Sequence, residues 1–253
     1  MSQVRNTWLR PLTARSVVAS TLLGLARPRL SAAALVASGE KFGIASGTTR
    51  VALSRMVDTG ELTATADGVY ELAGALLVRH ARQEQGRHPR TRKWKGDWRV
   101  GVVVGGARSA TERAALRRSM AAARFAQLRE GVWIRPDNLE VERDPSCAWF
   151  LGRSDEDLDV HALFGLDEWA STALRLLDAL RDSVGSLRDL DADALGETFI
   201  IAAATTRHLT VDPLLPSELL PAKWPGEQLR NAYDQYQDHF SATWRHWYRS
   251  TLD

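Results

Sequence analysis

Hydroxyl and guanidinium side chains are concentrated in one stretch near the N-terminus, SGTTRVALSRMVDTG, which runs from Ser46 to Gly60. Its polar members include Ser46, Thr48, Thr49, Arg50, Ser54 and Arg55. Arginine can donate two hydrogen bonds to O6 and N7 of a guanine, and short hydroxyl side chains bond phosphate oxygens. These residue types predict contacts with the base edges and backbone of double-stranded DNA, with Arg50 and Arg55 as the foremost candidates.

The same stretch has the pattern of an amphipathic helix. Its apolar residues recur at helical spacing and are expected to form a buried stripe of Val51, Leu53, Met56 and Val57. Ser46 is a suitable N-cap, because its hydroxyl can accept from a free N–H of the first turn. Gly60 stands where a left-handed residue usually ends a helix. The pattern favours a recognition helix, although an ordinary helix of another small domain would also fit it.

A β-hairpin is predicted directly after this helix, in ELTATADGVYEL, with its turn at Asp67 and Gly68. If Leu62 faces the core, Thr63 and Thr65 lie on the other face, near phosphates. Two helices precede the recognition helix: one over residues 13–26, with Thr13 as its candidate cap, and a second that begins after a capping Ser31. Three helices followed by a hairpin are typical of a winged helix-turn-helix, which we place in residues 1–85.

The middle of the chain predicts a second, smaller α+β domain. Residues 86–96 read as a basic linker that either contacts the DNA backbone or is a solvated tether. Strands are expected over 98–104, over 131–136 with Leu128 just before it, and over 147–152, with a helix capped by Ser109 after the first of them; residues 159–163 are expected to form a fourth strand or a helix. This order is typical of a ferredoxin-like fold, placed in residues 97–165.

Residues 166–253 predict a mainly helical C-terminal domain. The segment VDPLLPSELLPAKWPG interrupts the helices, because its four prolines exclude a regular helix or central strand. The last helix carries an unusual number of aromatic residues: Tyr233, Tyr236, Phe240, Trp244 and Trp247. They fit either a dimer interface or packing within their own domain.

Charge and composition narrow the function classes. Residues 1–95 contain 15 Lys and Arg against 6 Asp and Glu, a net charge of +9, whereas residues 151–253 carry a net charge of −9. This gradient favours a nucleic-acid-facing N-terminal part. Cys147 is the single cysteine, so internal disulfides and Cys-x-x-Cys zinc sites are excluded. We find no apolar run long enough to span a membrane and no secretory signal pattern, and we therefore expect a cytoplasmic protein without a bound metal or cofactor.

Enzymatic activity is not expected. A metal-dependent nuclease with a ferredoxin-like fold needs a carboxylate near the end of its first strand, but that strand reads VVVGG. No G-x-S-x-G nucleophile motif is present, and the six histidines are scattered. We predict no catalytic residue.

Four blocks of the sequence resemble the PaaX family of bacterial transcriptional repressors, which regulate phenylacetic-acid catabolism, and their relatives. The blocks are TTRVALSRMVDTGEL, WKGDWRVGVVV, GVWIRP and RHLTVDPLLPSELLPAKWPG, in family order over nearly the whole chain. The resemblance implies a homodimeric repressor that binds operator DNA. It also implies a middle domain similar to the CRISPR-associated Cas2 nucleases and, in the family's namesake, release from DNA by phenylacetyl-coenzyme A.

The effector site is the least determined feature. Two groups of residues could read an anionic aromatic ligand: Trp133 with Arg135, and Arg207 with His208 and Trp224. In the alternative, Arg207 forms an internal ion pair with Asp212, and Trp224 belongs to the core. The chain is thus expected to be a repressor released by a small molecule such as an aromatic acyl-CoA or aromatic acid. Otherwise it is an architectural DNA-binding protein that binds no ligand and whose C-terminal domain serves dimerisation.

Overall fold

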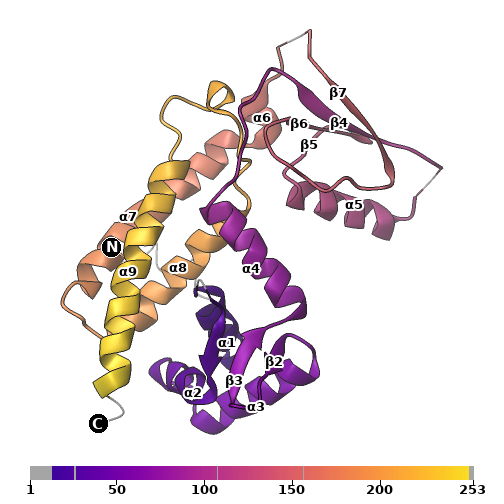
Figure 1. Ribbon diagram of the computed structural model, residues 1–253. Coiled ribbons are helices and arrows are strands. Elements are labelled where there is room, and N and C mark those ends of the chain that lie inside the picture. Colours follow the sequence, from indigo (N-terminus) through magenta and orange to yellow (C-terminus); the bar gives the residue numbers. More distant parts are fainter. Residues whose placement is uncertain (1–12, 26, 107, 156, 251–253) are drawn as a thin grey trace.

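The computed structural model describes residues 13–25, 27–106, 108–155 and 157–250 of the chain. Figure 1 shows three parts: an N-terminal group of helices with a small sheet, a central sheet with one helix, and a bundle of long C-terminal helices. The expected fold class, a winged helix-turn-helix followed by a ferredoxin-like domain and a helical domain, is confirmed.

The N-terminal part is built from three short helices, α1 (Ala14–Leu23), α2 (Ala32–Lys41) and α3 (Ser46–Asp58). Thr13 caps α1 and Ser31 caps α2 as predicted, since each hydroxyl accepts from the backbone N–H three residues later. Their apolar faces meet in a core that includes Val18, Leu22, Leu35, Leu53 and Met56. This core holds α3 against α1 and α2 and leaves its other face open.

The wing is a three-stranded antiparallel sheet in the order β1-β3-β2. Its strands are β1 (Arg29–Ser31), β2 (Leu62–Ala64) and β3 (Val69–Leu72). The hairpin turn lies where it was predicted, with Gly68 at φ +73°. Strand β1 was not predicted, because three residues carry no periodic signal and the strand exists only through its pairing with β3.

Helix α4 (Gly74–Arg87) leaves the wing and runs beside α8 (Figure 1). The sequence predicted a linker that begins at residue 86, and this was wrong because the helix continues to Arg87. Gly86 is a buried helical residue, and a Cβ there would lie 2.6 Å from the backbone oxygen of Leu209. The glycine therefore permits a close helix crossing rather than a flexible tether.

The central domain is a four-stranded antiparallel sheet in the order β5-β6-β4-β7, with helix α5 (Ala110–Ala122) capped by Ser109 as predicted. The strands are β4 (Trp98–Val103), β5 (Ala126–Arg129), β6 (Val132–Pro136) and β7 (Cys147–Gly152). This is the strand order of a ferredoxin-like domain in which residues 137–146 replace the second helix. Cys147 is buried in the sheet, as predicted for a small apolar side chain.

The segment that was expected to form either a fourth strand or a helix, residues 159–163, is a helix. It forms α6 (Val160–Phe164). Asp159 caps it by accepting from the N–H of Ala162 at 3.0 Å, and Gly165 ends it at φ +61°. In so short a segment, these local caps decide the structure against a weak alternation of apolar residues. The strand that completes the sheet is β5, of which the sequence had indicated only Leu128.

The C-terminal domain packs three helices, α7 (Leu166–Leu187), α8 (Ala194–Thr210) and α9 (Gly226–Ser250). The proline-rich segment between α8 and α9 forms no regular helix or strand, as predicted, and contains one 3-10 turn, η2 (Ser217–Leu219). The aromatic residues of α9 belong to their own domain. Tyr233 and Tyr236 are buried in its core, and Phe240, Trp244 and Trp247 pack against it.

Candidate nucleic-acid interface and domain junction

Helix α3 presents a polar and cationic face to solvent. Thr48, Arg50, Ser54 and Arg55 are exposed, as expected of DNA-contacting residues. Neither arginine forms an ion pair with any residue that the structure describes. Both guanidinium groups therefore keep all their donors for a ligand. The first turn of α3 also has no side-chain cap, so its backbone N–H groups are open to a phosphate.

Three predictions about this helix were wrong. Thr49 is fully buried, and a Cβ at Gly39 would lie only 2.2 Å from its hydroxyl oxygen, so Thr49 packs against α2 and cannot reach DNA. Val51 was assigned to the buried stripe but is 51% exposed. Ser46 is the first helical residue rather than the N-cap, which is Ala45. The close approach of α2 at Gly39 rotates the buried face toward Thr49 and away from Val51.

The exposed Val51 lies within the face that carries the polar side chains of α3. An apolar side chain on a recognition surface can contact the methyl group of thymine. Sequence reasoning missed this residue because a valine at helical spacing is ordinarily assigned to a core.

The two wing threonines have different surroundings. Thr63 is exposed on β2. The hydroxyl of Thr65 lies 3.1 Å from the carbonyl oxygen of Val69 and 3.3 Å from its N–H, so it closes the hairpin turn. Thr63 is therefore the better placed of the two to contact a phosphate.

The basic residues from the end of α4 onward divide into two groups: those that form ion pairs and those that are exposed. Arg87 donates to Glu84 and Asp234, each at 3.0 Å, and lies over the ring of Tyr233 at 4.8 Å. It joins α4 to α9 and is not a DNA contact. Arg92 pairs with Asp137 of the central domain at 2.7 Å. The remaining members of the stretch are exposed: Arg90, Lys93 and Lys95.

Asp212 joins all three parts of the molecule. It is 1% exposed, and its carboxylate accepts from Arg230 at 2.6 Å and from the N–H of Leu214 at 2.9 Å. Its backbone oxygen accepts from Arg124 of the central domain at 2.8 Å. Arg230 also donates to the carbonyl of Gly86 in α4 at 2.8 Å. We call Asp212, Arg230, Arg124 and Gly86 the domain junction.

The predicted alternative pair of Arg207 with Asp212 is wrong. Arg207 is exposed on α8 and bonds the carbonyl of Ala203 in its own helix. Arg230, eighteen residues after Asp212, takes its place. The sequence held a signal of a packed segment in its Asp-Pro and Leu-Pro pairs, but it did not identify which cation lies opposite Asp212.

Trp133 and Arg135 do not form an effector site. Trp133 is buried in the core between the central sheet and α5, and Arg135 is fully buried. Arg135 donates to the carbonyl of Ala123 at 3.1 Å and to Asn138 at 2.9 Å. Burial, together with the nearby guanidinium of Arg124, lowers the pKa of Arg135 to about 9. These bonds hold the central sheet together.

His208 and Trp224 lie close together, on either side of a third ring. Trp169 stacks on His208 at 4.4 Å and on Trp224 at 4.5 Å between ring centroids. His208 also places its Nε2 3.0 Å from the carbonyl oxygen of Trp169. Burial lowers the pKa of His208, which favours a neutral ring. The three rings already occupy one another's faces, so they form part of the fold rather than an open ligand site.

No group of three or more His, Cys, Asp and Glu residues is placed to hold a metal ion in the part of the chain that the structure describes. Within the same residues, no helix combines the length and the apolar character needed to cross a membrane.

The architecture defines a class of protein: a winged helix-turn-helix regulator with an open recognition helix, joined to a Cas2-like central domain and a helical C-terminal domain. Residues 13–76 match the family described as PaaX-like protein, residues 91–147 match the PaaX protein central Cas2-like domain, and residues 164–249 match the PaaX-like protein C-terminal domain.

A solved structure supports the same assignment. The chain is similar to the uncharacterized protein Rv0674 from Mycobacterium tuberculosis, with 39% sequence identity and a TM-score of 0.75 over 92% of this chain and 97% of that one. No curated protein matches the chain. The chain belongs to the PaaX family, whose members are DNA-binding transcriptional regulators and not enzymes.

Proposed function

We propose that this protein is a cytoplasmic repressor that binds operator DNA as a homodimer and is released by a small-molecule effector. The observation that carries the proposal is the open face of α3, with Arg50 and Arg55 exposed and without ion-pair partners among the described residues. The net charge of +9 over residues 1–95 supports it, because cationic surfaces release counterions from DNA on binding.

In the proposed complex, α3 enters the major groove and the wing lies along the backbone. Arg50 and Arg55 read base edges, Val51 contacts a thymine methyl group, and Thr48 and Thr63 bond phosphates. A dimer presents two copies of α3 to two half-sites about one helical turn apart. The resemblance to the family's namesake supports an effector that is an aromatic acid or its acyl-CoA thioester, and target genes in aromatic-acid degradation.

The proposed DNA binding is tested by selecting the bound sequence from random duplexes and then titrating that sequence in a mobility-shift assay. Arg50→Ala should weaken specific binding by about 1–3 kcal/mol, on the order of 10- to 100-fold, and relax selection at one base position. The matched control is Arg181→Ala, which removes an exposed arginine from the acidic C-terminal part. Equal operator affinity for Arg50→Ala and the control would contradict the placement of α3 in the groove.

One observation favours a second candidate, an architectural DNA-binding protein that binds no ligand. The residues that the sequence assigned to an effector are buried, engaged with one another or, like Arg207, exposed on a helix surface. A thermal-shift screen with aromatic acids and acyl-CoA thioesters separates the two candidates. Tight operator binding without a shift by any compound would favour the architectural protein.

A further inference from the structure

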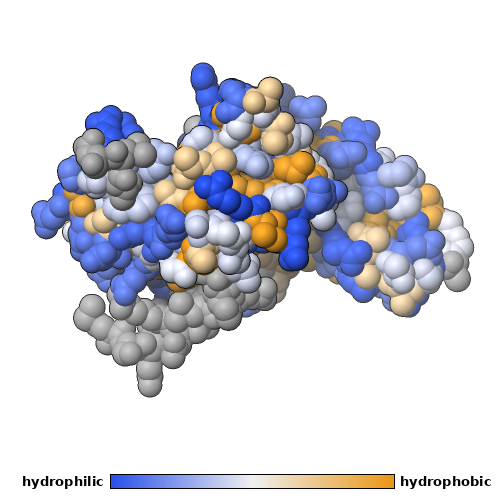
Figure 2. Space-filling view, turned by 90° about the horizontal axis from the view of Figure 1, so that it is seen from below, coloured by the Kyte–Doolittle hydropathy of each residue, from blue (hydrophilic) through white to orange (hydrophobic). Residues whose placement is uncertain are grey.

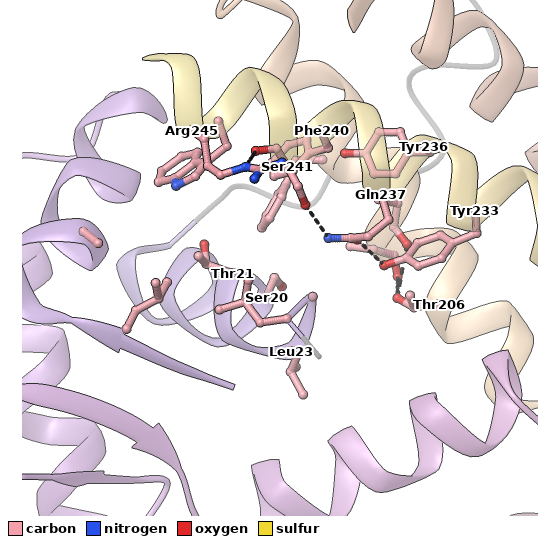
Figure 3. Close-up of a pocket in the computed structure, with 18 of the residues that line it drawn as sticks. Ser20, Thr21, Leu23, Thr206, Tyr233, Tyr236, Gln237, Phe240, Ser241 and Arg245 are labelled. Atoms are coloured by element: carbon pink, nitrogen blue, oxygen red, sulfur yellow. Dashed lines mark hydrogen bonds between the residues drawn. The ribbon is translucent and has the colours of Figure 1, made fainter. Parts of the chain in front are cut away.

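A cavity of about 450 Å³ lies between the winged helix and the C-terminal bundle. Ser20 and Thr21 of α1 face α9 across an open space in Figure 3. Figure 2 shows hydrophobic side chains gathered near the middle of the molecule, bordered by hydrophilic ones. Ligand sites are often concave, mainly apolar and placed between domains, and a volume of this size suits a ligand of one or two rings.

The wall of the cavity is a row of aromatic rings from three helices. Phe42, which follows α2, lies 4.8 Å from Phe199 of α8, and Phe199 lies 6.2 Å from Phe240 of α9. Phe240 continues the row to Trp244 at 6.5 Å. All four rings line the cavity. A flat aromatic or other apolar group would bury its surface against them.

The charged residues that line the cavity are all cationic. Among the residues that the structure describes, they are Arg79 of α4 and Arg245 and Arg249 of α9, and no Asp or Glu of that part of the chain contributes to the lining. None of the three arginines forms an ion pair with a described residue. Partial burial and the nearby guanidinium groups of Arg207 and Arg15 lower the pKa of Arg79, which marks an excess of positive charge on this side. An anionic group would relieve that excess.

A buried polar side chain also lines the cavity. Gln83 of α4 is 4% exposed, yet its amide makes no side-chain hydrogen bond to any residue that the structure describes. The amide atoms are not among the enclosed polar atoms without a partner, so they face the open part of the cavity, where a ligand oxygen would accept from the amide.

We propose that this cavity binds a small organic anion with an aromatic body, whose acidic group is held by Arg245 and Arg249, one turn apart on α9, while Arg79 of α4 adds positive charge to the wall. The aromatic body lies against the row from Phe42 to Trp244, and Gln83 donates to a polar atom of the ligand.

The site also couples the ligand to the position of the winged helix, and this step depends on the proposed function. Residues of both domains line the cavity. The two domains also form two direct ion pairs, Lys41 with Asp193 and Arg87 with Asp234, each at 3.0 Å. A ligand that contacts both domains favours the relative position in which it fits best. Because α3 packs on α1 and α2, any such shift changes how α3 meets DNA.

Fluorescence titration of the full chain with 8-anilinonaphthalene-1-sulfonate, an aromatic anion made of a naphthalene and a phenyl ring, tests the site. We expect saturable binding of one probe per chain and displacement by 1-naphthoate. Arg245→Gln should weaken probe binding about fivefold to tenfold, because one charge-assisted contact is lost. Ala203→Trp places an indole in the cavity and should abolish saturable binding, while Arg181→Gln on α7 should leave it unchanged.

Unchanged probe binding in both cavity variants would overturn the proposal. It would also be overturned if Ala203→Trp turned a dimer into a monomer in sedimentation, since a second copy would then occupy the cavity. Circular dichroism of each variant confirms that it is folded. Probe binding and operator binding are measured separately, so a protein that binds the probe but no DNA would refute the proposed function and leave the site standing.

Discussion

Replacing Asp212 with alanine tests whether the domain junction stabilises the arrangement of the three parts. The carboxylate side chain is 2% exposed and its partner Arg230 is 13% exposed, so the pair lies almost entirely out of water. Removing the acid leaves the Arg230 charge without its carboxylate and the N–H of Leu214 without an acceptor. Breaking a buried pair in this way costs about 3–5 kcal/mol.

This loss in the free energy of unfolding should be measurable when urea unfolding is monitored by tryptophan fluorescence. The melting temperature should fall by on the order of 10 °C. Asp212→Asn removes the charge but keeps an oxygen that can accept from the N–H of Leu214. It should therefore lower the free energy of unfolding by less, about 2 kcal/mol. The control is Asp178→Ala, which breaks an exposed pair with Arg181 and should cost less than about 1 kcal/mol. A loss below about 1 kcal/mol for Asp212→Ala would refute the reasoning.

Three further predictions concern packing and protonation. Gly86→Val should destabilise the crossing of α4 on α8 by several kcal/mol, measured by thermal unfolding, because a Cβ there meets backbone at 2.6 Å. Gly101→Ala should cost about 1–3 kcal/mol in urea unfolding, since a Cβ would lie 2.9 Å from the ring of Trp149. His208 has a lowered pKa in the fold, so the unfolded chain binds its proton more readily and stability falls as pH drops below about 6.5. His208→Phe keeps a ring on Trp169 and should flatten that part of the stability–pH curve. If the slope is unchanged, the pH dependence arises from groups other than His208.

The sequence by itself determined the elements whose signals are local. Thr13, Ser31 and Ser109 cap helices as predicted, and the hairpin turns at Gly68. The recognition helix was predicted in place, with its exposed arginines. A cap or a tight turn depends on residues within a few positions of one another, so its signal is contained in the sequence pattern.

Tertiary structure decided the features that depend on distant partners. The fully buried Thr49 and the exposed Val51 exchange their expected roles because Gly39 lets α2 approach one side of α3. Asp212 pairs with Arg230 rather than Arg207, since the irregular segment after α8 turns its carboxylate toward α9. The cavity brings α1 and α4 against α8 and α9, which lie more than one hundred residues apart in the chain. Which of several similar side chains meet is fixed by how the helices pack, and composition and periodicity do not carry that information.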